Sequence, residues 1–117
     1  MHRSTLCLLA MLAAPAWAEG APAADRMPAD AIGRPYYDCL LDQARSRRGS
    51  LDAAIAAARK ACEPKSNDLF TSIVLLRMEN GVYDSEEQRL AARDEHAKAI
   101  ADIAALARET LAAAGRK

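Results

Sequence analysis

The chain has 117 residues, of which 51% are hydrophobic and 4% aromatic, and its 16 basic residues balance its 16 acidic ones. A chain of this length forms one small domain, whose core alone gives marginal stability. Because the formal net charge is zero, the chain has no overall electrostatic attraction for nucleic acid, and we exclude nucleic acid as a partner.

Residues 1–18 have the pattern of a secretory signal peptide. A short basic start precedes a charge-free apolar run from Leu6 to Ala14, and small residues surround the expected cleavage point before Glu19. The apolar run is too short for a comfortable bilayer span, which takes about 20 residues. We therefore predict a periplasmic or secreted protein that is not an integral membrane protein after cleavage. An uncleaved membrane anchor is the alternative.

Residues 19–34 are rich in alanine and proline and lack helical periodicity. This composition predicts a flexible leader. A linker that holds the domain away from the membrane is the simpler interpretation, and a partner-binding tail is the alternative. The helical domain is then expected to cover residues 35–117.

Residues 36–62 form two short alanine-rich helical patterns separated by a polar turn. Ser50 can accept a hydrogen bond from an amide of the next turn, so the second helix is expected to begin directly after it. Pro64 disfavours helical geometry in the residue before it and is expected to end this helix just past Cys62. Two antiparallel helices around the turn bring Cys39 beside Cys62. The geometry permits a disulfide, although spacing alone does not prove one.

The cysteine count favours the same bond. Cys7 is removed with the signal peptide, which leaves Cys39 and Cys62 as an even pair in an exported chain. Closing the loop between them is expected to contribute about 3.5 kcal/mol in the chain-entropy model. A redox dithiol is disfavoured, because catalytic cysteines usually lie two residues apart at a helix start.

The succession of Tyr36 and Cys39, with Ala61 and Cys62 closing an alanine-rich second helix, resembles a pattern of small exported bacterial proteins without an assigned activity. The resemblance covers about a quarter of the chain. It implies a helical hairpin with one disulfide, and it implies nothing about function.

A third helix is expected between the caps offered by residues 66–68 and the stop at Asn80 and Gly81. A strand is the alternative for so aliphatic a run, but there is no second strand for it to pair with. A helix that is apolar around most of its circumference has to be buried centrally or covered by a partner, and we take this one as the candidate core element. Its apolar residues are Leu69, Phe70, Ile73, Val74, Leu76 and Met78.

Asp84 and Ser85 open a last helix of about 30 residues, and Glu87 and Gln88 are placed to complete a capping box. Its apolar stripe is thin at first, so we expect the first half to project into solvent. Together these elements predict an all-α fold, a small four-helix domain built on a disulfide-closed helical hairpin, with a long C-terminal helix. The candidate face for a partner helix, or for self-association, consists of Ile100, Ile103, Ala107 and Leu111.

The sequence contains no evident catalytic constellation. His96 has no ligand-type residue three or four positions away, so we interpret it as a solvated surface residue rather than a metal ligand. No carboxylate pair lies on a clearly apolar face, and there is no glycine-rich phosphate loop or nucleophile turn. We expect a protein that is not an enzyme and has no cofactor and no metal. An enzyme or metal carrier is the remote alternative.

Binding is therefore the expected activity. The preferred interpretation is binding of a protein partner in the bacterial envelope. Arg45, Arg47 and Arg48 at the hairpin tip suggest the alternative, an anionic lipid or glycan surface, and a solvated turn is the simpler interpretation of these residues. Tyr36 and Tyr37 are expected as core and rim of the hairpin, with a binding aromatic as the alternative for one of them.

Overall fold

The computed structural model describes residues 26–117, and over this range its secondary structure consists of α-helices without a strand. The helices are α2 (Arg34–Arg45), α3 (Leu51–Ala61), α4 (Glu63–Glu79) and α5 (Glu86–Ala113). The predicted all-α class, the disulfide-closed hairpin and the long C-terminal helix are confirmed. The predicted signal peptide and residues 19–25 of the predicted leader lie outside the described residues.

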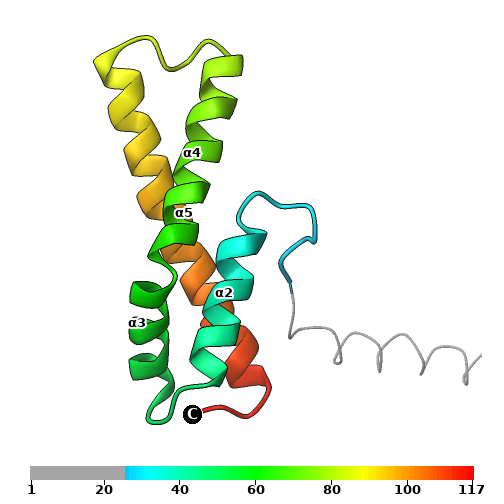
Figure 1. The fold of residues 1–117 in the computed structure, drawn as a ribbon. Coiled ribbons are helices and arrows are strands. Elements are labelled where there is room, and N and C mark those ends of the chain that lie inside the picture. The colour runs from blue at the N-terminus through cyan, green and yellow to red at the C-terminus, as the bar shows by residue number, and fades with distance from the viewer. Residues whose placement is uncertain (1–25) are drawn as a thin grey trace, which may run out of the picture.

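The described chain has two parts, which follow from the unequal lengths of its helices (Figure 1). α2 and α3 have 12 and 11 residues and form an antiparallel hairpin against the C-terminal half of α5. With its 28 residues α5 is about 42 Å long, so its first half extends past the hairpin together with α4. We call α2, α3 and residues 100–113 the base, and residues 70–96 the arm.

The hairpin is closed by a disulfide between Cys39 on α2 and Cys62 at the end of α3, with the two Cα atoms 5.9 Å apart. Cys62 is fully buried. At the other end of α3, the Ser50 hydroxyl accepts a hydrogen bond from the amide of Ala53 at 3.2 Å, as its position before the helix predicts.

The start of α4 differs from our prediction. We expected caps from residues 66–68, but α4 begins at Glu63, directly after Cys62, which ends α3. Pro64 lies in the first turn of α4, where its missing amide proton is not needed and its fixed φ suits a helix start. Pro64 therefore marks the boundary between α3 and α4 because it lies in the first turn of α4.

The core lies in the base, where α2, α3 and the second half of α5 meet. Tyr36 and Tyr37 are both buried there, so neither lies on the rim or is available as a binding aromatic. From α4 the buried side chains are those of Ser66, Leu69 and Ile73.

Our expectation that α4 is the central core element is wrong for its second half. Leu75, Leu76 and Met78 are 56%, 43% and 57% exposed. The second half of α4 extends beyond the level that α2 and α3 reach, and among the described helices α5 alone runs beside it there (Figure 1). An apolar helix with no neighbours on its other sides leaves its apolar surface in solvent.

α5 begins with the predicted capping box. The Ser85 hydroxyl accepts from the Gln88 amide at 3.1 Å, and the Gln88 side-chain oxygen accepts from the Ser85 amide at 3.3 Å. Glu87 takes no part in the box. The reciprocal bonds satisfy amides that the first turn of a helix cannot pair internally, so the arm has a defined end at this point.

The described end of the predicted leader, residues 26–34, packs on the base. The Arg34 guanidinium donates to the carbonyl of Met27 at 2.6 Å, and Met27 packs against the core. Gly33 is buried so closely that a Cβ atom there would lie 2.5 Å from Cδ1 of Ile103. Within residues 26–117, no helix is long and apolar enough to cross a membrane.

Candidate binding surfaces on the arm and the base

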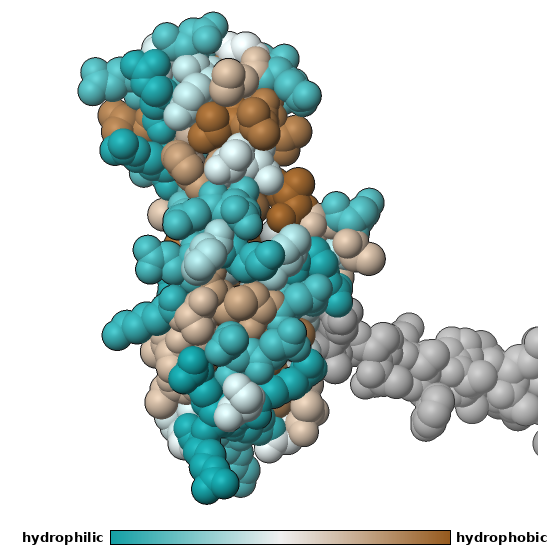
Figure 2. All heavy atoms as spheres, in the orientation of Figure 1, coloured by the Kyte–Doolittle hydropathy of each residue, from teal (hydrophilic) through white to brown (hydrophobic). Residues whose placement is uncertain are grey.

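The arm carries an exposed apolar surface. Figure 2 shows apolar side chains gathered toward its free end, above a base whose visible face is mostly polar. Contiguous exposed apolar surface on a small protein usually marks an interaction site. The large apolar residues exposed there are Leu75, Leu76, Met78, Val82 and Leu90.

Polar contacts join α4 and α5 where the arm meets the base and again along the arm. The His96 Nε2 atom lies 2.9 Å from the Ser66 carbonyl oxygen and 3.1 Å from the Ser66 hydroxyl. Because a carbonyl oxygen only accepts, Nε2 carries the proton and donates it to that oxygen. The His96 ring also meets Phe70 edge-on, with the ring centroids 5.2 Å apart. Further along the arm, Arg77 pairs with Glu95 at 2.9 Å.

These contacts correct our interpretation of His96 as a solvated surface residue. It is half-buried and joins two helices. The sequence signal was missing, because Ser66 lies 30 positions away and no local pattern links the two residues. Within residues 26–117, no group of three or more histidine, cysteine or acidic side chains is placed to hold a metal ion.

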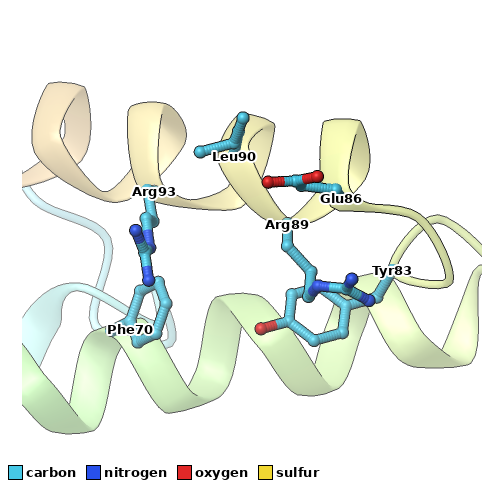
Figure 3. A pocket seen from close by; sticks show the side chains of 6 residues that line it. All are labelled: Phe70, Tyr83, Glu86, Arg89, Leu90 and Arg93. Carbon is cyan, nitrogen blue, oxygen red and sulfur yellow. The ribbon is translucent and has the colours of Figure 1, made fainter.

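A cleft of about 300 Å³ opens between α4 and α5 on the arm. This volume is at the lower limit for small-molecule pockets, so the cleft suits one or two side chains of a partner better than a whole cofactor. In Figure 3, Arg89 and Arg93 extend from α5 toward α4, whereas Leu90 points away from α4. The cleft is lined by Phe70, Tyr83, Glu86, Arg89, Leu90 and Arg93.

The charged groups of the cleft are unpaired. Among the described residues, Glu86, Arg89 and Arg93 take part in no ion pair and in no side-chain hydrogen bond. Their charges are therefore available to a partner, and they have both signs. No local pattern in the sequence distinguishes these three residues, because the cleft between them and Phe70 exists only once α4 and α5 are paired.

The arginines of the hairpin turn lie at the opposite end of the molecule. Arg45 and Arg48 are exposed, whereas Arg47 is half-buried, with one guanidinium nitrogen 3.3 Å from the Gln43 side-chain oxygen. The Nε atom of Arg47 is buried and has no hydrogen-bond partner in the described structure.

The C-terminus adds two cations to this turn, which the sequence did not predict. The Arg116 guanidinium donates to the carbonyls of Ala44 at 2.9 Å and Arg47 at 2.5 Å, and the amide of Leu51 donates to the Lys117 carbonyl at 2.9 Å. Arg116 thus gives a second donor to the Ala44 carbonyl, which also accepts from the Arg47 amide at 3.2 Å, and a donor to the Arg47 carbonyl in the turn. We call the resulting group the basic end, which consists of Arg45, Arg47, Arg48, Arg116 and Lys117.

Beside the basic end, Arg108 on α5 is paired with Asp52 in the first turn of α3 at 2.6 Å. The hydrogen bond from Arg108, followed by its positive charge, lowers the pKa of the Asp52 carboxyl below its ordinary value. Both side chains are largely exposed, so the pair contributes little to stability.

The face that we predicted for a partner helix is covered in the folded chain. Ile103, Ala107 and Leu111 are buried in the core of the base, and Ile100 is partly buried against it. The prediction is therefore wrong for the folded chain, because α2 and α3 already cover this stripe. The sequence showed an apolar stripe on α5 but not which helices would occupy it.

No family model, curated protein or solved structure matches the chain.

Proposed function

We propose that the protein acts by binding a protein partner in the bacterial envelope, and that the arm is its docking surface. The exposure of five large apolar side chains on the arm carries this proposal. Burying such surface against a partner gains about 25 cal/mol for each Å² removed from water. The predicted signal peptide supports the envelope as the compartment.

The internal contacts of the arm support the same role. A docking surface binds best when it is already ordered, because ordering it on binding costs conformational entropy. The capping box at Ser85 fixes the start of α5, and the contact between His96 and Ser66 joins α5 to α4 before any partner arrives. The apolar residues between these two points are thus presented on a fixed pair of helices.

Brief crosslinking in cells, followed by purification of the tagged protein and mass spectrometry, tests the proposal. Replacement of Leu75 and Met78 with glutamine is expected to abolish recovery of the partner without unfolding the chain, since both side chains are exposed. The matched control replaces Ala53 and Ala56, exposed on α3, with glutamine and is expected to leave recovery unchanged. Equal recovery with both variants would rule out the arm as the docking surface.

The second candidate function is binding of an anionic lipid or glycan surface by the basic end. Arg116 and Lys117 lie beside the turn that carries Arg45 and Arg48, and this proximity favours the candidate. A cluster of cations attracts anionic surfaces in a salt-dependent manner. The cations of this group come from two segments of the chain, which hydrogen bonds of Arg116 and Lys117 hold together.

Sedimentation with vesicles that contain anionic phospholipid tests this second candidate. Replacing the exposed Arg45 and Arg48 with glutamine is expected to reduce binding, and added salt is expected to reduce it further. Arg59 and Lys60, exposed at the other end of α3, provide a control with the same loss of charge. Absence of binding by the unaltered protein, or equal losses in both variants, would refute the candidate.

A further inference from the structure

One side of α5 on the arm carries a repeating set of residues that the base does not use. Glu86, Leu90, Arg93 and Ala97 are spaced by four, three and four positions, so their Cα atoms share a narrow stripe of the helix. All four residues are exposed, whereas Ala92 is completely buried. The stripe therefore lies on a solvent-accessible side of α5, from which the Arg93 side chain bends toward α4 (Figure 3).

The order of charges on this stripe is the important feature. An acidic group lies at one end, a basic group two turns later, and Leu90 between them is half exposed at 50%. Glu86 and Arg93 are about 10 Å apart along the helix axis, and neither pairs with another described residue. Each charge thus lacks its opposite within the monomer.

A helix with this order of charges is complementary to a copy of itself running in the opposite direction. Turning the stripe around the midpoint between Glu86 and Arg93 places each acid opposite a base and brings the two Leu90 side chains together. Two-fold dimers have this kind of interface, in which the same patch is used by both subunits.

We infer that the arm binds the arm of a second copy of this chain, with the two α5 helices antiparallel and Glu86 of each copy paired with Arg93 of the other. This inference goes beyond the proposed function, because the stripe on α5 shares only Leu90 with the five exposed apolar residues of the proposed docking surface. The two Leu90 side chains meet at the centre of the interface, at the edge of the clefts that Phe70 and Tyr83 line.

The mixture of charges favours a second copy over a partner of a single charge. An acidic segment bound to Arg93 would also be repelled by Glu86. A basic segment bound to Glu86 would be repelled by Arg93. The contact between the two stripes is short, about 17 Å from Glu86 to Ala97, so the interface is smaller than that of standard stable complexes. We therefore expect a reversible dimer that forms at high concentration.

Variants that exchange the charges of Glu86 and Arg93 test the inference. Analytical ultracentrifugation of the purified oxidised chain measures how much of each variant is dimeric. The unaltered protein is expected to become dimeric as its concentration rises toward about 1 mM. Glu86→Arg and Arg93→Glu each place like charges opposite one another at both pairs, so each is expected to weaken dimerisation about tenfold or more. The double variant carries both exchanges, which restores both pairs, and it is expected to dimerise as the unaltered protein does.

Mixing the two single variants gives the sharpest result. In a mixed dimer, the arginine introduced at position 86 of one copy meets the glutamate introduced at position 93 of the other, and the remaining pair is the native one. An equimolar mixture is therefore expected to recover dimers that neither variant forms alone. Glu87→Arg makes the same change of charge on an exposed residue beside the stripe and is expected to have no comparable effect.

Three results would overturn the inference: a monomer at every concentration, a dimer insensitive to the single exchanges, or a mixture without dimers. None of them bears on the capture of a different protein by Leu75 and Met78, so the proposed function is judged separately. Circular dichroism of each variant checks the fold, which should be unchanged because the exchanged residues are exposed and unpaired.

Discussion

Tyr37 and Thr110, which lie 73 positions apart, are joined by a 2.7 Å hydrogen bond between their hydroxyl groups inside the base. Thr110 donates its own proton to the carbonyl of Leu106 at 3.0 Å, so the Tyr37 hydroxyl is the donor between the two. Both side chains are buried. The bond therefore links α2 to the C-terminal half of α5 in a place where water cannot replace it.

Removing the Tyr37 hydroxyl tests this link. Tyr37→Phe is expected to lower the free energy of unfolding by about 1–2 kcal/mol, because the Thr110 oxygen loses a buried donor. Urea unfolding measures this change. Thr110→Val should then lower the free energy of unfolding less in the Tyr37→Phe protein than in the unaltered protein. Tyr83→Phe is the control, since no hydrogen bond to its hydroxyl occurs among residues 26–117. Additive losses at Tyr37 and Thr110 would contradict the coupling.

Loss of the disulfide should weaken the whole domain. Replacing Cys39 and Cys62 with alanine is expected to cost about 3–4 kcal/mol, a large share of the stability of so small a domain. The melting temperatures of the oxidised protein, the reduced protein and the variant measure this cost. Reductant should lower the melting temperature of the unaltered protein and leave that of the variant unchanged. Equal melting temperatures before and after reduction would show that the bond is dispensable.

The contact between His96 and Ser66 should determine how tightly the arm is closed. His96→Ala removes a half-buried donor and the edge contact with Phe70, and a cost of about 1–2 kcal/mol is expected. Hydrogen exchange should become faster in α4 and in the first half of α5 and stay unchanged in the base. Lys98→Ala, which breaks only an exposed ion pair, is the control. Uniform acceleration throughout the chain would contradict a local role.

The pair of Asp52 and Arg108 predicts a small dependence of stability on pH. The pKa of Asp52 is lowered in the folded state, so its contribution is present above the unfolded value of about 3.9 and is lost as the pH falls through the folded value. Asp52→Asn should therefore be less stable than the unaltered protein near pH 7, and the difference should shrink as the pH is lowered toward about 2. Urea unfolding at both pH values, with Asp42→Asn as an exposed control, measures this difference. A gap that persists in acid would assign the effect to another cause.

Local signals in the sequence predicted the elements that depend on neighbouring residues. Ser85 and Gln88 are three positions apart, and the capping box that they form needs nothing else from the chain. The pairing of Cys39 with Cys62 followed from an even count of cysteines and from the reversal of the chain between them. Pro64 also marks a boundary in the sequence, but a proline suits both the residues after one helix and the first turn of the next.

Features that depend on the relative lengths of distant elements could not be predicted. The apolar pattern of α4 looks the same whether a neighbouring helix covers it or not, and Leu75 and Leu76 are exposed because α2 and α3 do not extend along the second half of α4. The apolar stripe from Ile100 to Leu111 is the opposite case. Its pattern suggested a free face, but α2 and α3 cover it in the fold. The position of Arg116 at the hairpin turn involves a separation of 72 residues from Ala44, for which the sequence has no periodic signal.

Cys62 ends α3, begins α4 and is covalently bonded to α2, so the point at which the arm leaves the base is tied to all of the hairpin. The arm therefore leaves the base at a residue that three helices share, and any rotation of α4 relative to α2 is restrained by a covalent bond as well as by packing.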